Sequence, residues 1–214
     1  MPRIPPLSTE DAPEAAQPML KGLEQLGQVS NFLRTVANSP AALEGYLGLI
    51  RGLSKSSLPP GIARSIALAI AEYNGSDYSL SSNVHLARTA EKLCDAEITA
   101  NRNGFSNSPK AEAAVRFGLA VARARGHVSP EQLDALITAG YSHAQAVEIV
   151  HHVALAILSS YLNEVAGTVI DFPVVNTRKP AGFDKSSTHA TEWAQSEPRD
   201  VSPEPEHRRH GATP

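Results

Sequence analysis

Apolar residues recur at helical spacing along most of the chain, and no stretch alternates apolar and polar residues as a half-buried strand does. Within residues 40–55, for example, Leu43, Leu47 and Ile50 would share one face of a helix. Prolines and glycines interrupt the pattern where helices would begin and end. The sequence therefore predicts an all-α bundle of about seven to nine helices.

Capping and breaking signals predict where each helix begins and ends. Serine or threonine precedes several segments, and Asn74-Gly75 is a strong stop because both residues tolerate left-handed backbone geometry. The predicted helices cover residues 8–27, 31–36, 40–55, 59–73, 76–93, 96–102, 108–126, 129–140 and 142–166.

The last predicted helix, 142–166, is the longest and the most apolar. Its residues Ile149, Val153, Ile157, Tyr161 and Val165 are expected on one side. Much of its remaining surface is apolar too, which is typical of a central helix or of an interface helix in a homo-oligomer.

The character of the chain changes near residue 178. Residues 178–214 lack leucine, isoleucine and methionine and contain five of the 16 prolines. Such a segment buries too little apolar surface to offset its ordering entropy. We expect one helical domain over residues 1–177 and a disordered tail over 178–214, in which His189, His207, His210 and Trp193 are solvated.

Composition narrows the classes of function. The net charge of -3 and pI of about 6.2 argue against a nucleic-acid partner. The longest uncharged apolar run, near residues 153–158, is too short to span a bilayer, and the N-terminus has no signal-peptide core. We therefore expect a soluble cytoplasmic protein with no membrane association.

The only cysteine, Cys94, excludes an internal disulfide or dithiol pair. We expect it to be a half-buried packing residue, with a peroxidatic or intermolecularly paired thiol as the alternative. His151-His152 lacks the i, i+4 relation of a helical metal site, and no other cluster has metal-ligand spacing. There is also no glycine-rich phosphate loop, so neither a metal nor a cofactor is expected.

Five sequence blocks carry a resemblance to a known family, namely Asn38–Leu47, Ile66–Gly75, Ala96–Arg102, Val147–Leu155 and Val169–Val175. In their order and separations they resemble the peroxidase-related branch of the alkylhydroperoxidase D (AhpD) and carboxymuconolactone decarboxylase family. The resemblance runs from about residue 3 to residue 175 and implies an AhpD-like helical bundle that assembles into a homo-oligomer.

The family places its chemistry at the start of the helix that follows Asn74-Gly75, in a Cys-x-x-Cys-x-x-x-His pattern with a glutamate twelve residues before the first cysteine. A helix N-terminus favours a thiolate, and the second cysteine resolves the oxidised first one. The corresponding residues here are Ser76, Ser79, Asn83 and, for the glutamate, Arg64. All four differ from the pattern, and a serine hydroxyl cannot form a disulfide.

Other residues are weak replacements for the missing groups. His85 lies about 180° around the helix from Ser76, so the two cannot pair within it. Glu72 could reach the edge of the site, although a solvated or interhelical salt-bridge role fits it better. His152 matches the family pattern and is either a packing or interface histidine or a group that enters a pocket.

Three functions remain open. In the first, the protein has lost thiol peroxidase activity and serves as a binding or regulatory module, with the hydroxyls, the amide and Arg64 suited to a small organic acid. In the second, it is a decarboxylase-type enzyme that uses His152 or Glu72 as an acid–base group on a lactone or related organic acid. In the third, it is a residual alkyl hydroperoxide reductase that acts on a hydroperoxide through Cys94.

Overall fold

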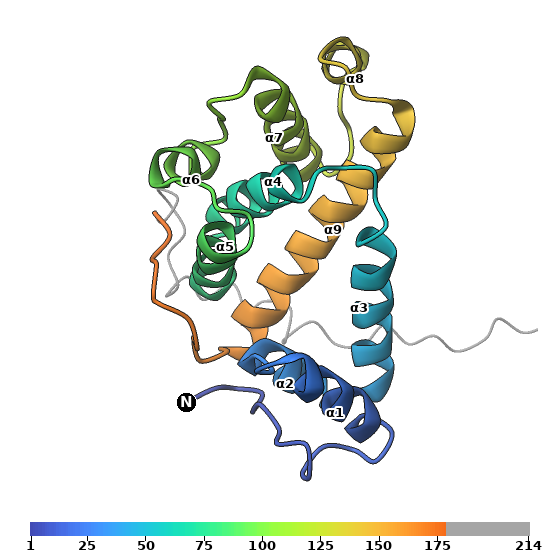
Figure 1. The fold of residues 1–214 in the computed structure, drawn as a ribbon, viewed down its shortest axis with the longest axis vertical. Helices are drawn as coiled ribbons and strands as arrows, with labels where there is room; N and C mark the ends of the chain where they lie inside the picture. Colours follow the sequence, from blue (N-terminus) through green and yellow to red (C-terminus); the bar gives the residue numbers. More distant parts are fainter. Residues whose placement is uncertain (179–214) are drawn as a thin grey trace, which may run out of the picture. The chain divides into compact units, whose positions relative to one another are not determined.

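The computed structural model describes residues 1–178, and within them the chain forms nine α-helices and no strand (Figure 1). This confirms the predicted all-α fold. Most of the predicted tail, residues 179–214, lies outside the described residues. The helices are α1 Gln17–Leu26, α2 Asn31–Val36, α3 Pro40–Leu53, α4 Pro60–Tyr73, α5 Asp77–Thr89, α6 Asp95–Arg102, α7 Pro109–Arg123, α8 Pro130–Thr138 and α9 His143–Ala166.

The start of the first helix was predicted wrongly. Residues 9–15 form turns, and α1 begins only at Gln17. Pro13 and Pro18 lack a backbone N–H, and a proline is tolerated only in the first turn of a helix. The helix can therefore start only where Pro18 falls in that turn. Ser8, the expected cap, instead accepts a hydrogen bond from the backbone N–H of Asp11 at 3.1 Å.

Several helices end earlier than predicted. Helix α5 ends at Thr89 rather than near Leu93, and α7 ends at Arg123 rather than at Gly126. Non-glycine residues take left-handed backbone angles just beyond both ends, with φ of 56° at Lys92 and 52° at Arg125. Nothing in their side chains signals this conformation, so the sequence placed both helix ends too late.

Helix α4 is the central element. It packs against α5, α6, α7 and α9 (Figure 1). Five of the six consecutive apolar residues from Ile66 to Ala71, all except Ala67, are buried, so this part of α4 is enclosed on nearly all sides. At Gly118 of α7, an added Cβ would lie only 3.1 Å from the side chain of Ile66, so this glycine permits close approach of α7 to α4.

Helix α9 has two distinct faces. Ile149 and Val153 are buried, but Tyr161 and Val165 are 60% and 61% exposed, so the prediction that they share one side was wrong. Residues four apart turn about 40° further at each step, which amounts to about 160° between Ile149 and Val165. One end of the predicted row therefore faces the core, and the other end faces away from it.

Helix α9 is also long and apolar enough, by length and composition alone, to cross a membrane. Within α9, only 22% of the 18-residue stretch that meets these criteria is buried among the described residues. Its other face packs against α4 and α7, which is the arrangement of a core helix with one uncovered side.

Candidate functional site

A cavity of about 570 Å³ lies between α3, α4, α5 and α9. It is walled largely by apolar side chains, among them Phe32, Leu53 and Leu155. Four of the six residues named from the sequence also line it, namely Arg64, Ser79, Asn83 and His152. The structure thus gathers residues from three helices, which lie up to 88 positions apart in the chain, around one space.

The turn before α5 positions the two serines. Gly75 has a φ of 66°, which only glycine adopts readily, and it reverses the chain so that α5 packs against α4. Ser76 is the N-cap residue and is fully buried, but its hydroxyl does not cap the helix. It donates instead to the hydroxyl of Ser79 at 3.3 Å, and Asn163 donates to the same Ser79 oxygen at 3.4 Å.

Arg64 takes part in a polar chain at the cavity wall. Its guanidinium donates to Asn83 Oδ1 at 2.6 Å and pairs with Glu91 at 3.2 Å, and Asn83 in turn donates to the backbone carbonyl of Ser79 at 2.8 Å. The Glu91 side chain is only 9% exposed. An arginine that faces a buried carboxylate has its charge largely offset.

Glu91 is the cavity residue that sequence reasoning missed. It was assigned to the end of the predicted helix 76–93, where nothing marked it as a site residue. Because α5 actually ends at Thr89, the chain turns and brings Glu91 to the cavity beside Arg64. No spacing rule would have found it, since its position depends on an unpredicted helix end.

His152 forms part of the α9 wall of the cavity. Burial lowers its pKa from the ordinary value, and the nearby Arg64 and His151 lower the pKa further, while Glu148 opposes them. Its Nε2 atom is buried and has no hydrogen-bond partner in the described part of the chain. A neutral imidazole with a vacant nitrogen is suited to hydrogen bonding or to proton transfer.

Unpaired buried polar atoms concentrate in the residues of this cavity. Within residues 1–178, seven buried side-chain nitrogen or oxygen atoms lack a hydrogen-bond partner, and four of them belong to cavity-lining residues. Native proteins leave few such atoms unpaired, so a cluster of them calls for an explanation. The four atoms are Arg64 Nε, Glu91 Oε2, His152 Nε2 and Asn163 Oδ1.

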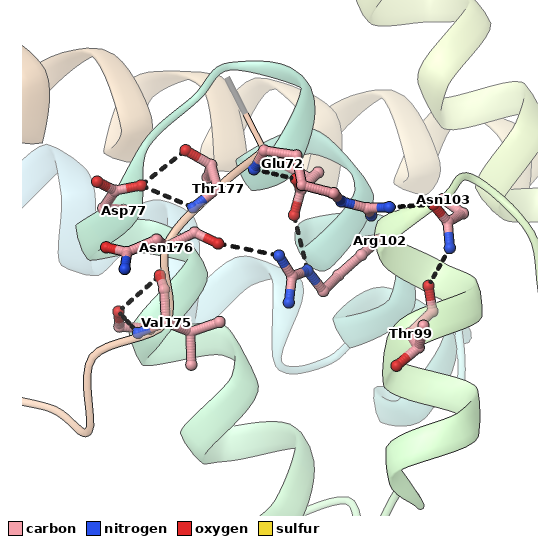
Figure 2. A network of polar contacts seen from close by, with 10 residues as sticks. Glu72, Asp77, Thr99, Arg102, Asn103, Val175, Asn176 and Thr177 are labelled. Atoms are coloured by element: carbon pink, nitrogen blue, oxygen red, sulfur yellow. Dashed lines mark hydrogen bonds and ion pairs between the residues drawn. The ribbon is translucent and has the colours of Figure 1, made fainter. Parts of the chain in front are cut away.

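Glu72 does not line the cavity. Its carboxylate accepts from Arg102 Nε at 2.7 Å and from the backbone N–H of Arg178 at 2.7 Å (Figure 2). Arg102 also donates to the backbone carbonyl of Asn176, and Thr177 donates to Asp77. The predicted interhelical salt bridge of Glu72 is confirmed, and with it Glu72 anchors the segment that follows α9.

Two other residues considered from the sequence also lie away from the cavity. Cys94 is the N-cap residue of α6 and is exposed, so the expectation of a half-buried packing residue was wrong. The cause is the early end of α5, after which residues 90–94 form a surface connection. The His85 ring lies 5.6 Å from that of Phe172, and His85 does not line the cavity. Within residues 1–178, no group of three or more His, Cys, Asp or Glu side chains could hold a metal ion.

Solved structures share the fold of this chain, although no protein-family model and no curated protein matches it. A peroxidase-related AhpD core protein from Ralstonia eutropha JMP134 is 22% identical with a TM-score of 0.70, over 79% of this chain and 92% of that one. A peroxidase-related protein from Silicibacter sp. TM1040 is 16% identical with a TM-score of 0.67, over 78% and 91%.

The third similar structure is a point variant of the debrominase Bmp8 in complex with 2,3,4-tribromopyrrole. It is 25% identical to this chain with a TM-score of 0.65, and the match covers 78% of this chain and 91% of that protein. Taken together, these similarities show that the chain has an AhpD/carboxymuconolactone decarboxylase-like helical fold.

Proposed function

We propose that this protein binds a small, mostly apolar organic molecule in the cavity between α3, α4, α5 and α9, and that it has lost thiol peroxidase activity. The observation that carries the proposal is the cavity itself. About 570 Å³ of space adjoins Ser79, one of the two serines that stand at the thiol positions, and this volume is within the usual size range of small-molecule sites.

The positions of the two serine hydroxyls and of the Cys94 thiol support the loss of thiol chemistry. Ser76 and Ser79 are hydrogen-bonded to each other, and among residues 1–178 neither has a histidine in hydrogen-bond contact that could activate it as a nucleophile. Cys94 is on the surface at α6 and does not line the cavity. The cavity wall therefore carries no group that could reduce a peroxide and then form a disulfide.

The charges around the cavity favour a neutral ligand over the small organic acid considered from the sequence. That hypothesis needs Arg64 as a cation, but Glu91 is paired with it. The depressed pKa of His152 keeps that side chain neutral near pH 7, so it adds no positive charge. The walls are mostly apolar, with hydroxyls such as those of Tyr46 and Ser159 for orientation.

The Bmp8 variant supports the ligand size and chemistry. That protein holds 2,3,4-tribromopyrrole, a small halogenated ring without a carboxylate, on the same type of scaffold. We use this ring as the first probe, and we use pyrrole-2-carboxylate as the acid for comparison.

Calorimetric titration of the full chain with the two probes tests the proposal. We expect saturable binding of the neutral ring with at least about tenfold higher affinity than of the acid, because the acid would bring an unmatched charge into the site. Ala67 lines the cavity, so Ala67→Phe should weaken binding by occupying part of it, whereas Ala41→Phe on the exposed side of α3 should not. If neither probe binds to the wild-type chain, the proposal is wrong.

A peroxide-consumption assay with a thiol reductant tests the lost activity. We expect no turnover above that of the reductant alone for the wild type, and none for Cys94→Ser. Turnover that disappears in Cys94→Ser would instead establish the residual peroxidase of the third hypothesis. Turnover that persists in Cys94→Ser would show that the scaffold reduces peroxides without a thiol, and this result would also contradict the proposal.

A decarboxylase-type reaction is the second candidate, and a specific observation favours it. His152 lines the cavity with a vacant, buried Nε2 and a depressed pKa, as a general base requires. Glu72 is excluded from this role because its carboxylate is held by Arg102 and Arg178 away from the cavity. Carbon dioxide release from a lactone acid, lost in His152→Gln and unaffected by thiol alkylation, would establish this reaction.

A further inference from the structure

Arg64 and Glu91 form an incomplete ion pair at the cavity wall. An arginine and a carboxylate can join through two parallel hydrogen bonds, but here only Nη2 of Arg64 and Oε1 of Glu91 are in contact, at 3.2 Å. The second donor and the second acceptor, Arg64 Nε and Glu91 Oε2, are buried and have no hydrogen-bond partner among the described residues. The pair therefore holds one unused N–H donor and one unused acceptor oxygen.

The remaining nitrogen of the guanidinium is already engaged. Nη1 of Arg64 donates to Asn83 Oδ1 at 2.6 Å, and Asn83 is itself bonded to the backbone carbonyl of Ser79 at 2.8 Å. Arg64 is thus held by Asn83 on one side and by Glu91 on the other. Both members of the ion pair line the cavity, with 23% of the Arg64 side chain and 9% of the Glu91 side chain exposed, so a ligand in the cavity lies within reach of them.

The chemistry of the two unused atoms limits which ligand can satisfy both. A carboxylate ligand would accept from Arg64 but would bring a like charge to Glu91. An amidinium ligand would donate to Glu91 but would bring a like charge to Arg64. A cyclic amide is neutral, and it carries a C=O acceptor and an N–H donor side by side in one plane. It can therefore form one hydrogen bond with each atom.

We infer, on the basis of the function proposed above, that the cavity takes a neutral cyclic amide, whose carbonyl oxygen accepts from Arg64 Nε and whose N–H donates to Glu91 Oε2. The apolar walls of the cavity suit the ring that carries the amide. Two buried hydrogen bonds of this kind discriminate strongly, because an analogue that lacks one of the groups leaves a buried protein atom unpaired.

A matched set of two-ring probes tests the inference by titration calorimetry on the full chain. 2-Quinolone carries both the N–H and the C=O, coumarin has an oxygen in place of the N–H, and 2-naphthol carries a single hydroxyl group. We expect 2-quinolone to bind at least about tenfold more tightly than either of the others, since only its planar edge pairs with both atoms. A smaller preference over either probe overturns the inference.

Glu91→Gln tests whether this carboxylate sets the preference. The glutamine oxygen can still accept from Arg64 Nη2, which leaves an NH₂ donor where the ligand N–H needs an acceptor. We expect the preference for 2-quinolone over coumarin to fall at least about fivefold. Glu72→Gln is the control, because the Glu72 side chain is also 9% exposed but does not line the cavity, and it should keep the full preference. An unchanged preference in Glu91→Gln overturns the inference. If circular dichroism shows that this variant is unfolded, the wild-type comparison still decides.

The binding of 2,3,4-tribromopyrrole separates a failure of this inference from a failure of the proposed function. If that ring binds and 2-quinolone either does not bind or shows no preference, the cavity is a ligand site but not one for a cyclic amide. If neither that ring, pyrrole-2-carboxylate nor any of the two-ring probes binds, the proposed function is wrong, and the cyclic amide with it.

Discussion

Two arginine–glutamate clusters each include a residue of α4, and they differ in how completely their polar atoms are satisfied. At the segment after α9, both oxygens of Glu72 accept hydrogen bonds, from Arg102 and from Arg178 (Figure 2). At the cavity, Arg64 and Glu91 are paired, yet Arg64 Nε and Glu91 Oε2 are both buried and have no hydrogen-bond partner among the residues that the structure describes.

The difference separates a structural cluster from a binding cluster. A buried ion pair stabilises a fold only when its remaining hydrogen-bonding capacity is used, and the Glu72 cluster meets this condition by joining α4, α6 and the C-terminal segment. The Arg64 cluster leaves part of its hydrogen-bonding capacity unused among the described residues, and it adjoins an apolar cavity. Unused hydrogen-bonding capacity beside open space is what a site retains for a ligand.

The largest expected effect is on stability at Glu72. Glu72→Ala leaves Arg102 without its buried partner, and we expect the free energy of unfolding to fall by about 3 kcal/mol. Glu112→Ala removes the carboxylate from the exposed pair with Arg116 and should cost no more than about 0.5 kcal/mol. Urea denaturation monitored by circular dichroism measures both. A loss below about 1 kcal/mol at Glu72 would contradict its structural role.

The next effect is on ligand preference at Glu91. Glu91→Gln keeps the shape of the side chain but leaves the charge of Arg64 uncompensated, so we expect the affinity for pyrrole-2-carboxylate to rise about tenfold. Glu72→Gln is the matched control, since it removes a carboxylate of equal burial that does not line the cavity. Titration calorimetry measures both variants. An equal gain in the two variants would mean that net charge, rather than the Arg64–Glu91 pair, sets the preference.

The smallest effect is the pH dependence from His152. Its pKa in the folded protein is depressed by burial, so the unfolded chain binds more protons between that value and the ordinary pKa of 6.5. Stability should therefore be fully present above about pH 6.5 and should fall as the pH drops through the folded pKa. His152→Gln should flatten this slope in thermal melts between about pH 7 and pH 5. If the stability of the variant changes with pH as steeply as that of the wild type, groups other than His152 determine the pH dependence.

The helices were predictable because each is specified by neighbouring residues. Ser129-Pro130 and Ser142 start α8 and α9 as expected, and both serines form capping boxes. The prediction failed at α1, where two prolines overruled an apparent cap, and at the ends of α5 and α7, where non-glycine residues turn left-handed. These failures are local, and they leave the helix order intact.

The candidate site was predictable only in part. The resemblance located Arg64, Ser79, Asn83 and His152, and the structure brings all of them to one cavity. It could not place Glu91, whose position depends on a helix end. For Glu72 the sequence favoured a salt bridge but could not name Arg102 as the partner, because that depends on how α4 and α6 pack. The burial and the ion pairing of these glutamates arise only when the helices pack together, so the spacing of residues along the sequence gave no sign of them.

The sequence by itself therefore determined the helical class, the order of the helices and the absence of a thiol pair, because each follows from residue identity and short-range spacing. Only the tertiary structure decided that Arg64 is paired with Glu91, that a cavity remains beside Ser79 and that one face of α9 is left uncovered. These three features depend on how segments distant in the chain pack, and the function proposed for the cavity depends on the first two.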